Sequence, residues 1–330
     1  MIQPGLGLTF ARAPVTLLAG YLGAGKTTLL NRLLTEPHGQ RIAVVINEFG
    51  EESIDDKLIV KTDDEIIEMA NGCMCCVVKD DTRDALFAMK ERRLGRFGTP
   101  LVFDRVVIEA SGVANPVPVM RMLLEDELLV DGYTLDGVVT LVDAFNIKTQ
   151  LARATEVKQQ IACADVVVVN KIDRVHEENL PAIVRRVAGL NPRARIVPTQ
   201  HANVPLVDIF SINGFGRELV ISEYYDSHNH DDDVQSLVVR AVRPLVRHAF
   251  EEWLSCNIIL RADDMYRYKG IIAFEGNPAL TIVQGVHAYF DMHTGELWQI
   301  GDRHESVLVL IGRDLDRLAL EEGFKSCQTF

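Results

Sequence analysis

A glycine-rich segment near the N-terminus has the residue types and spacing of a phosphate-binding loop. The pattern is Gly, four free residues, Gly, Lys and then Ser or Thr, and Gly20, Gly25, Lys26 and Thr27 supply it. Backbone N–H groups of such a loop surround a polyphosphate at a helix N-terminus, where the helix dipole also favours negative charge. We therefore predict a site for a nucleoside triphosphate, formed by Gly20, Tyr21, Leu22, Gly23, Ala24, Gly25, Lys26, Thr27 and Thr28.

Three side chains are candidates for the phosphate chemistry. We expect Lys26 to reach the β- and γ-phosphates and the Thr27 hydroxyl to bind Mg²⁺. Glu109 ends the apolar run 105–109, as expected of an acid that a strand carries to the Mg²⁺ site. Gly112, three residues later, would place a backbone N–H near the γ-phosphate and serve as the hinge of a switch. The sequence identifies no water-positioning residue, so we expect slow intrinsic turnover.

The tetrapeptide Asn170-Lys171-Ile172-Asp173 follows a run of four valines and has the composition of a guanine-recognition loop. In such a loop the Asp carboxylate accepts hydrogen bonds from N1 and N2 of the base, Asn contacts the base edge, and Lys packs along the ring. Asn170, Lys171 and Asp173 therefore favour GTP over ATP. An ATP-dependent kinase of a small molecule is disfavoured by the same three residues.

Three cysteines lie within four positions, at Cys73, Cys75 and Cys76. Their thiolates are close enough in sequence to share one soft or borderline cation, for which Zn²⁺ is the favoured choice. Three sulfur ligands leave one position of a tetrahedron for another ligand, which suits a metal ion that has to leave again. The alternative is a set of packed or redox-active cysteines, because this spacing is not that of a zinc finger.

The segments around these motifs alternate between short apolar runs and stretches of helical periodicity. Runs that are apolar on both faces suit the centre of a parallel sheet covered on both sides. We predict an α/β P-loop NTPase domain with a doubly wound, mostly parallel sheet, and with its active loops at the carboxyl ends of the strands. Strands are expected before the P-loop and at 42–47, 105–109, 137–142, 165–170 and 194–198, and helices at 80–94, 116–125, 147–163 and 177–190.

The pattern changes near residue 211, and four segments are expected: an extension (1–13), the P-loop domain (14–210), a polar linker (211–235) and a smaller α+β domain (236–330). The linker contains His228 and His230 beside three aspartates, which fits an acidic linker about as well as a weak metal-collecting loop. In the last domain, strands are expected at 236–242, 268–274, 281–290 and 307–311, and helices at 248–258 and 315–323.

Charge and composition exclude several classes of protein. The 330 residues include 34 basic and 47 acidic side chains, a net charge of −13 that disfavours binding to nucleic acids or anionic membranes. No apolar stretch approaches the roughly 20 residues of a membrane span. Six cysteines are too few for a disulfide scaffold, so we expect a cytoplasmic protein.

Together the motifs resemble those of the CobW-type P-loop GTPases, a group that includes zinc metallochaperones, cobalamin-biosynthesis proteins and nitrile hydratase activators. The resemblance extends over residues 14 to 327, so the smaller domain is similar to the CobW C-terminal domain. It rests on the segments 20–28, 47–51, 72–76, 109–112 and 170–173, and in the second domain on 267–270, 284–287, 290 and 309–313.

The resemblance implies GTP on the P-loop, Mg²⁺ at Thr27 with Glu109 nearby, and Zn²⁺ or Co²⁺ at the three cysteines. It also implies that 47–51 is a switch segment, in which Glu51 is an auxiliary metal ligand. Ile46 departs from the family pattern, because some relatives carry a metal-binding Glu there. Residues that would lie next to the nucleotide are Val77, Val78, Lys79 and Asp80.

The leading hypothesis is a GTP-hydrolysing metallochaperone that transfers zinc to a client metalloprotein. One alternative keeps the GTPase but assigns it to cobalt insertion in cobalamin synthesis or to the activation of a metalloenzyme such as nitrile hydratase. Another is a passive metal-binding protein without significant turnover. Homo-oligomerisation is left open. Three further histidines, the three other cysteines and both tryptophans are expected to have packing or surface roles: His201, His287, His304, Cys163, Cys256, Cys327, Trp253 and Trp298.

Overall fold

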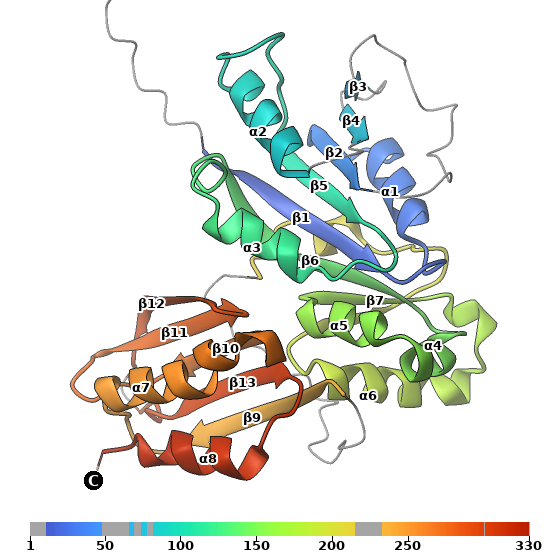
Figure 1. Cartoon of the computed structure of the whole chain (residues 1–330). Helices are drawn as coiled ribbons and strands as arrows, with labels where there is room; N and C mark the ends of the chain where they lie inside the picture. Colours follow the sequence, from blue (N-terminus) through green and yellow to red (C-terminus); the bar gives the residue numbers. More distant parts are fainter. Residues whose placement is uncertain are drawn as a thin grey trace, which may run out of the picture.

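The computed structural model describes residues 11–47, 66–68, 74–77, 82–214, 233–299 and 301–329, with only the backbone described for Asn47, 66–68 and 74–77. These residues form a larger domain with a mostly parallel sheet and a smaller domain with an antiparallel sheet (Figure 1). The predicted fold class is confirmed.

The larger sheet has the strand order β3-β4-β2-β5-β1-β6-β7-β8, in which only β3 is antiparallel to its neighbour. β3 and β4 are additions to the predicted set, and β4 contains two of the three clustered cysteines. The bounds are β1 Ala13–Gly20, β2 Ile42–Asn47, β3 Ile66–Glu68, β4 Met74–Val77, β5 Arg105–Ala110, β6 Tyr133–Asp143, β7 Val166–Asn170 and β8 Arg195–Pro198.

Helices cover both faces of this sheet. The apolar side chains of α1 pack in one core with the segment that follows β8, while α2 to α6 pack in a second core on the opposite face. The bounds are α1 Lys26–Thr35, α2 Thr82–Arg93, α3 Val117–Glu125, α4 Ile147–Arg153, α5 Thr155–Cys163 and α6 Leu180–Leu190, with short 3₁₀ turns at Ile172–Arg174, Glu177–Asn179 and Leu206–Asp208.

The single helix predicted over 147–163 is wrong, because the chain breaks at Ala154 into α4 and α5. Ala154 has extended backbone angles (φ −131°, ψ 111°). Ile147, Leu151, Val157 and Ile161 nevertheless all reach the same core. Their spacing fits one continuous helix, and no Gly or Pro marks the break, so periodicity alone could not reveal it.

The smaller domain has the strand order β12-β11-β10-β13-β9, with all neighbours antiparallel. The predicted strand over 281–290 is wrong: it is β11 and the start of β12, joined by a turn in which His287 has a positive φ of 51°. The bounds are β9 Gln235–Ala241, β10 Met265–Ile272, β11 Ala279–Val286, β12 Tyr289–Leu297, β13 Ser306–Gly312, α7 Arg247–Asn257 and α8 Arg317–Ser326, with a 3₁₀ turn at Ile259–Asp264.

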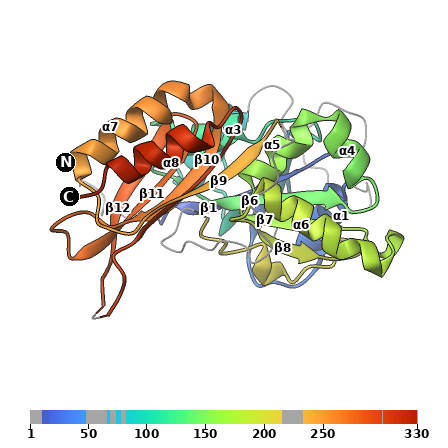
Figure 2. The same cartoon turned by 90° about the horizontal axis from the view of Figure 1, so that it is seen from below.

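The two domains share a continuous apolar interface. The smaller domain covers one face of its sheet with α7 and α8, and the other face lies against α3, α5 and α6 of the larger domain (Figures 1 and 2). Tyr266, Val286, Val309 and Ile311 belong to the same buried cluster as the helices of the larger domain. In the described part of the chain, no helix is long and apolar enough to cross a membrane.

Candidate functional site

The P-loop occupies the turn between the end of β1 at Gly20 and the start of α1 at Lys26. Gly25 has a positive φ of 109°, and a Cβ there would lie 2.5 Å from Nδ2 of Asn170, so glycine is required for both conformation and space. The first turn of α1 carries no acidic residue, and no side chain caps it. Its backbone N–H groups are therefore directed at a position suited to an anion.

The two predicted catalytic side chains of the loop differ in exposure. Lys26 is buried, and its Nζ donates a hydrogen bond to the carbonyl oxygen of Gly20 at 2.9 Å. Its ammonium group is therefore held across the mouth of the loop. Thr27 lies in the first turn of α1 and is exposed, as is Thr28. The Thr27 hydroxyl can accordingly reach a ligand without any rearrangement of the core.

The acid predicted to serve the Mg²⁺ site lies at the same edge of the sheet. Glu109 is buried near the carboxyl end of β5, in register with Leu18 of β1. Just beyond β5, a Cβ on Gly112 would lie 2.5 Å from the side chain of Leu22 in the P-loop. Only glycine allows this close approach. The segment after β5 therefore packs directly on the predicted phosphate-binding loop.

Asn170 connects three loops. Its side-chain amide donates to the carbonyl oxygen of Ala24 in the P-loop at 2.9 Å and accepts from the backbone N–H of Ala202 at 2.8 Å. The side chain is 2 % exposed. The sequence predicted a contact with the base edge, whereas in the structure both ends of the amide have protein partners. Asn170 thus braces the P-loop, but its amide keeps a second N–H, so the contact with the base edge and the role of the exposed Asp173 stay predictions.

Asp143, which the sequence analysis overlooked, positions the lysine of the guanine loop. Lys171 has a positive φ of 62°, and its Nζ donates to Asp143 at 2.8 Å. Burial of Asp143 opposes its ionisation, but hydrogen bonds from Lys171 and Asn146, and the charge of Lys171, outweigh burial and lower the pKa of Asp143. The sequence did contain a sign of this role. The apolar strand β6 ends at the acidic residue Asp143, just as the apolar strand β5 ends near Glu109.

The loop after β8 was also overlooked. His201 and Ala202 both have positive φ values, 54° and 52°. Thr199 stabilises this conformation because its hydroxyl donates to the carbonyl oxygen of Asn203 at 2.8 Å. His201 is exposed, as expected for a surface histidine. No local sequence pattern indicated this loop. It contacts the site through the hydrogen bond from Ala202 to Asn170 and through the Thr199 carbonyl oxygen, which accepts from the backbone N–H of Ile172 at 3.2 Å.

The cysteine motif lies on the same sheet as the P-loop. Cys75 and Cys76 belong to β4, whose backbone pairs in parallel with β2. Val77 is in register with Ile46 of β2, and Ile46 is in register with Glu109 of β5. Neighbouring strands lie ~4.8 Å apart, so the backbone of Val77 is about 10 Å from that of Glu109. The end of the cysteine motif therefore lies at the same edge of the sheet as the P-loop.

Several predicted site residues lie outside the described residues: Cys73, Glu51, Val78, Lys79, Asp80, His228 and His230. Side chains are not described for Cys75, Cys76 and Val77, so the metal site stays a prediction. Elsewhere in the described part of the chain, no group of three or more His, Cys, Asp or Glu residues gathers as a metal site would require.

The remaining cysteines and tryptophans fit packing roles. Cys163 is fully buried, and burial raises the pKa of its thiol to about 12. Cys327 is also buried, with its thiol pKa raised by burial, while Cys256 is exposed. Trp253 packs in the core of the smaller domain, and Trp298 stacks on His304 with ring centroids 4.9 Å apart. None of these residues adjoins the P-loop in sequence or in the sheet.

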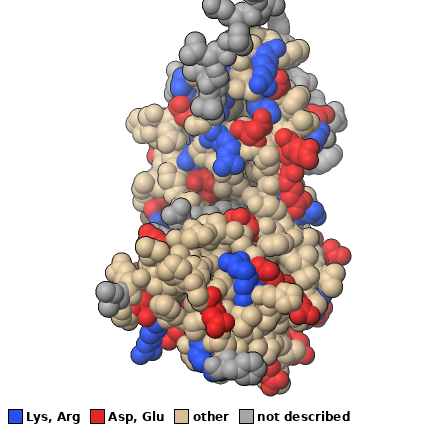
Figure 3. Space-filling view, turned by 90° about the vertical axis from the view of Figure 1, so that its left-hand side faces the viewer, with Lys and Arg blue, Asp and Glu red and all other residues tan. Residues whose placement is uncertain are grey.

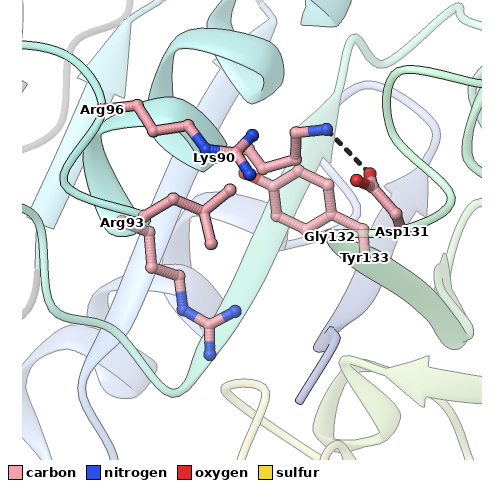
Figure 4. A pocket seen from close by; sticks show the side chains of 7 residues that line it. Lys90, Arg93, Arg96, Asp131, Gly132 and Tyr133 are labelled. Carbon is pink, nitrogen blue, oxygen red and sulfur yellow. Dashed lines mark hydrogen bonds and ion pairs between the residues drawn. The ribbon is translucent and has the colours of Figure 1, made fainter. Parts of the chain in front are cut away.

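A small cationic pocket of about 240 Å³ lies at the end of α2, lined by Lys90, Arg93 and Arg96 together with Asp131 and Tyr133 (Figure 4). Its cations already have partners within the chain. Lys90 donates to Asp131 at 2.7 Å, Arg93 to the carbonyl oxygen of Ala11 at 3.1 Å, and Arg96 to Glu91 at 3.3 Å. On the face drawn in Figure 3, basic side chains are likewise interspersed with acidic ones. These contacts are structural.

Comparison with known proteins agrees with this geometry. Residues 14–198 match the sequence model of the CobW/HypB/UreG nucleotide-binding domain, and residues 234–328 match the cobalamin synthesis protein cobW C-terminal domain. The chain is 35 % identical to zinc chaperone YjiA of Escherichia coli, covering 94 % of this chain and 97 % of that protein. It is 31 % identical to zinc chaperone CobW of Pseudomonas aeruginosa, covering 96 % and 92 %.

Among solved structures, the Zn(II)-bound YjiA GTPase from E. coli is similar over both domains. The TM-score is 0.83 at 33 % sequence identity, covering 97 % of this chain and all of that one. The match therefore includes the arrangement of the two sheets as well as the P-loop domain.

Proposed function

This chain belongs to the CobW family of nucleotide-binding proteins, and from that premise we propose that it is a GTP-hydrolysing zinc metallochaperone. In this proposal Zn²⁺ is the cargo, bound through Cys73, Cys75 and Cys76 and passed to a client metalloprotein. GTP binding and hydrolysis change the affinity for the metal ion or for the client. The names of the relatives support the choice of zinc and of GTP.

The observation that carries the proposal is the register across β4, β2, β5 and β1. Val77, Ile46, Glu109 and Leu18 occupy one row of the sheet, at the edge where the P-loop begins. The cysteine motif precedes Val77 on β4, at one end of this row. The phosphate-binding loop follows Leu18 on β1, at the other end. From β5, which leads to Gly112, a change at the γ-phosphate can reach β4 through two strand spacings of the sheet.

Each residue of the nucleotide site has a distinct role in the proposal. Lys26 neutralises charge on the β- and γ-phosphates, Gly112 supplies a backbone N–H, and Asp173 with Lys171 binds guanine. The Thr27 hydroxyl and the Glu109 carboxylate are hard oxygen donors of the kind that Mg²⁺ prefers, and they occupy the P-loop edge of adjacent strands β1 and β5. Mg²⁺, when bound there, would neutralise charge that develops on the phosphate oxygens.

The packing of Gly112 on Leu22 gives the switch its mechanical basis. Loss of the γ-phosphate removes a partner of the Gly112 backbone, and the segment after β5 is then free to shift relative to the P-loop. Because β5 pairs with β2, and β2 with β4, the same shift alters the support of the cysteine motif. The coupling must be reciprocal, so Zn²⁺ has to change GTP affinity by the factor by which GTP changes Zn²⁺ affinity.

The test is a zinc titration of the full chain, performed without nucleotide, with GDP and with a non-hydrolysable GTP analogue. We expect a Zn²⁺ affinity that differs by about fivefold or more between the GDP and GTP-analogue states. Cys75→Ser should weaken Zn²⁺ binding strongly. Cys256→Ser is the matched control, because that exposed cysteine lies on α7 in the other domain and should leave the titration unchanged.

Two results would contradict the proposal. Equal Zn²⁺ affinities in all nucleotide states would exclude a switch in metal affinity, and together with no measurable GTP turnover they would leave a passive metal-binding protein. A GTPase rate stimulated by Co²⁺ but not by Zn²⁺, measured on metal-free protein, would instead favour the cobalt-insertion function.

A further inference from the structure

A wide groove on the larger domain is lined by residues of α4, α5 and α6. Figures 1 and 2 show these three helices next to one another. The volume of the groove is about 1120 Å³, more than the roughly 300–1,000 Å³ typical of small-molecule sites. Its lining includes the apolar side chains of Phe145, Ile147, Leu151, Val175 and Ile183. Phe145 is 54 % exposed and therefore accessible to a partner.

The described residues that line the groove carry more positive than negative charge. Four are cations, Lys148, Lys158, Arg174 and Arg186, and one is an acid, Asp233, which is paired with Lys158 at 3.2 Å. The whole chain, by contrast, has a net charge of −13. Two of the cations, Lys148 and Arg174, are exposed. An apolar lining with exposed cations beside it is complementary to a helix with one apolar face and acidic flanks.

We propose that this groove, between α4 and α6 and next to the guanine loop, is a docking site for an acidic amphipathic helix of a partner protein. The apolar face of the helix packs on Phe145, Leu151 and Ile183, and its carboxylates pair with Lys148 and Arg174. The guanidinium of Arg174 stacks over the Phe145 ring at 4.5 Å from the centroid. A stacked guanidinium keeps its N–H edge available for a carboxylate.

The groove shares two loops with the predicted guanine site. Asp173 is followed directly by Arg174, and Asp143 precedes Phe145 by two residues. The same two loops are therefore joined twice, by the ion pair between Lys171 and Asp143 on the nucleotide side and by the stack of Arg174 on Phe145 on the groove side. A bound helix that fixes the stack also fixes Lys171 and Asp173. The docking surface does not depend on the proposed function. Only the coupling between the groove and the guanine site rests on the proposed function.

The test uses the full chain and two fluorescein-labelled helical peptides of about 18 residues, a length that supports helix formation. Both carry leucines along one face; the other face carries glutamates in one peptide and lysines in the other. Fluorescence anisotropy should show saturable binding of the acidic peptide and at least tenfold weaker binding of the basic one. The variant Lys148→Glu/Arg174→Glu should lose about tenfold or more in affinity for the acidic peptide.

Arg185→Glu is the matched control, because this arginine is exposed on α6 but does not line the groove. It should bind the acidic peptide like the parent chain. Phe145→Ser should also weaken binding, and circular dichroism should show the parent fold, since the side chain is largely exposed. Release of a fluorescent GDP analogue should slow or accelerate at least twofold when the acidic peptide is bound, but not in the groove variant.

Equal binding of the two peptides, no binding of the acidic peptide, or an equal loss in Arg185→Glu would overturn the docking site. Self-association of the chain that disappears in Lys148→Glu/Arg174→Glu, without peptide binding, would assign the groove to a second copy and also overturn it. Peptide binding without a change in GDP release would overturn the coupling alone. None of these measurements requires Zn²⁺ or GTP turnover. A failure of the docking proposal can therefore be distinguished from a failure of the proposed function.

Discussion

The larger sheet has two edges formed by strand ends, one where the strands begin and one where they end. Both edges contain similar charged residues, but these residues are organised in opposite ways. At the edge where β5, β6 and β7 begin, Arg105 pairs with Asp136 at 2.6 Å, and Asp165 pairs with Arg267 at 2.7 Å. All four side chains are buried, and their charges are matched within the chain. At the carboxyl edge the same three strands lead to Glu109, Asp143 and Asn170, which support loops that end in exposed groups such as Thr27 and Asp173.

The difference separates stability from function within one sheet. A buried ion pair is costly to break, because the remaining charge is left without a partner. A loop at the carboxyl edge can present an exposed group to a ligand while a buried neighbour holds it in place. Substitutions at the first edge should therefore change the free energy of unfolding, and substitutions at the second should change nucleotide binding and turnover.

The largest effect is expected at the first edge, from Asp165→Asn. Asp165 faces Arg267 and lies 3.9 Å from Arg193, whose pKa is lowered to about 9 by burial and by the charge of Arg267. Loss of the carboxylate should lower the free energy of unfolding by about 3–5 kcal/mol, measured by urea denaturation. Asp104→Asn is the control: its pair with Arg41 is exposed, so the loss should stay below about 1 kcal/mol. Equal losses of unfolding free energy in the two variants would show that burial does not decide how much each ion pair contributes to stability.

The largest effect at the carboxyl edge is expected from Thr27→Ala. Removal of the hydroxyl should lower Mg²⁺-dependent GTP turnover by about 100-fold or more, because several kcal/mol of charge stabilisation depend on correct placement of the ion. The melting temperature should not change, since Thr27 is exposed. Thr27→Ser keeps the hydroxyl and should retain most of the activity. A similar loss in both variants would exclude the hydroxyl as the relevant group.

Asp173→Asn should change the base preference without affecting stability. The carboxylate would lose charge-assisted hydrogen bonds to N1 and N2 of guanine, worth about 1.5–3 kcal/mol, so GTP should bind about ten- to a hundredfold more weakly. Xanthosine triphosphate should bind more tightly than before, because its 2-oxo group accepts a hydrogen bond from the new amide. Competition binding with both nucleotides measures the change. Unaltered GTP affinity would place guanine recognition elsewhere.

A smaller effect is expected from Asp143→Asn. The substitution keeps the size of the side chain and the oxygen that accepts from the backbone N–H groups of Phe145 and Asn146, but it replaces the oxygen that accepts from Lys171. GTP affinity should fall by about tenfold or less, as expected for a residue that acts through another. Stopped-flow measurements should assign the loss mainly to faster nucleotide release. An increase in affinity would mean that Asp143 competes with the nucleotide for Lys171.

The smallest effect is the pH dependence contributed by the same carboxylate. The pKa of Asp143 is lowered in the folded chain, so its contribution to stability is present above the ordinary carboxylate pKa of about 4 and is lost as the pH falls through the lowered value. The difference in unfolding free energy between the parent chain and Asp143→Asn should therefore shrink as the pH is lowered below about 4. A difference that is constant from neutral to acidic pH would exclude this carboxylate as its source.

Much of the fold could be predicted because its signals are local. Apolar runs identified five strands besides β1, and the P-loop spacing identified the turn between β1 and α1. The break at Ala154 and the turn at His287 escaped because neither contains Gly or Pro, and the apolar pattern continues across them. The strands β3 and β4 also escaped because they have only 3 and 4 residues, too few for an alternating pattern to stand out.

The candidate site likewise has features that the sequence could predict and features that it could not. The sequence by itself determined the phosphate-binding loop, the guanine tetrapeptide and the cysteine cluster, because each is a set of residue types at short spacing that one backbone turn can organise. Only the tertiary structure decided that Asn170 braces the P-loop, that Asp143 orients Lys171, and that Val77 and Glu109 share a row of the sheet. These relations join residues about 30 to 150 positions apart. The pairing of strands brings such residues together, and no short stretch of sequence encodes that pairing.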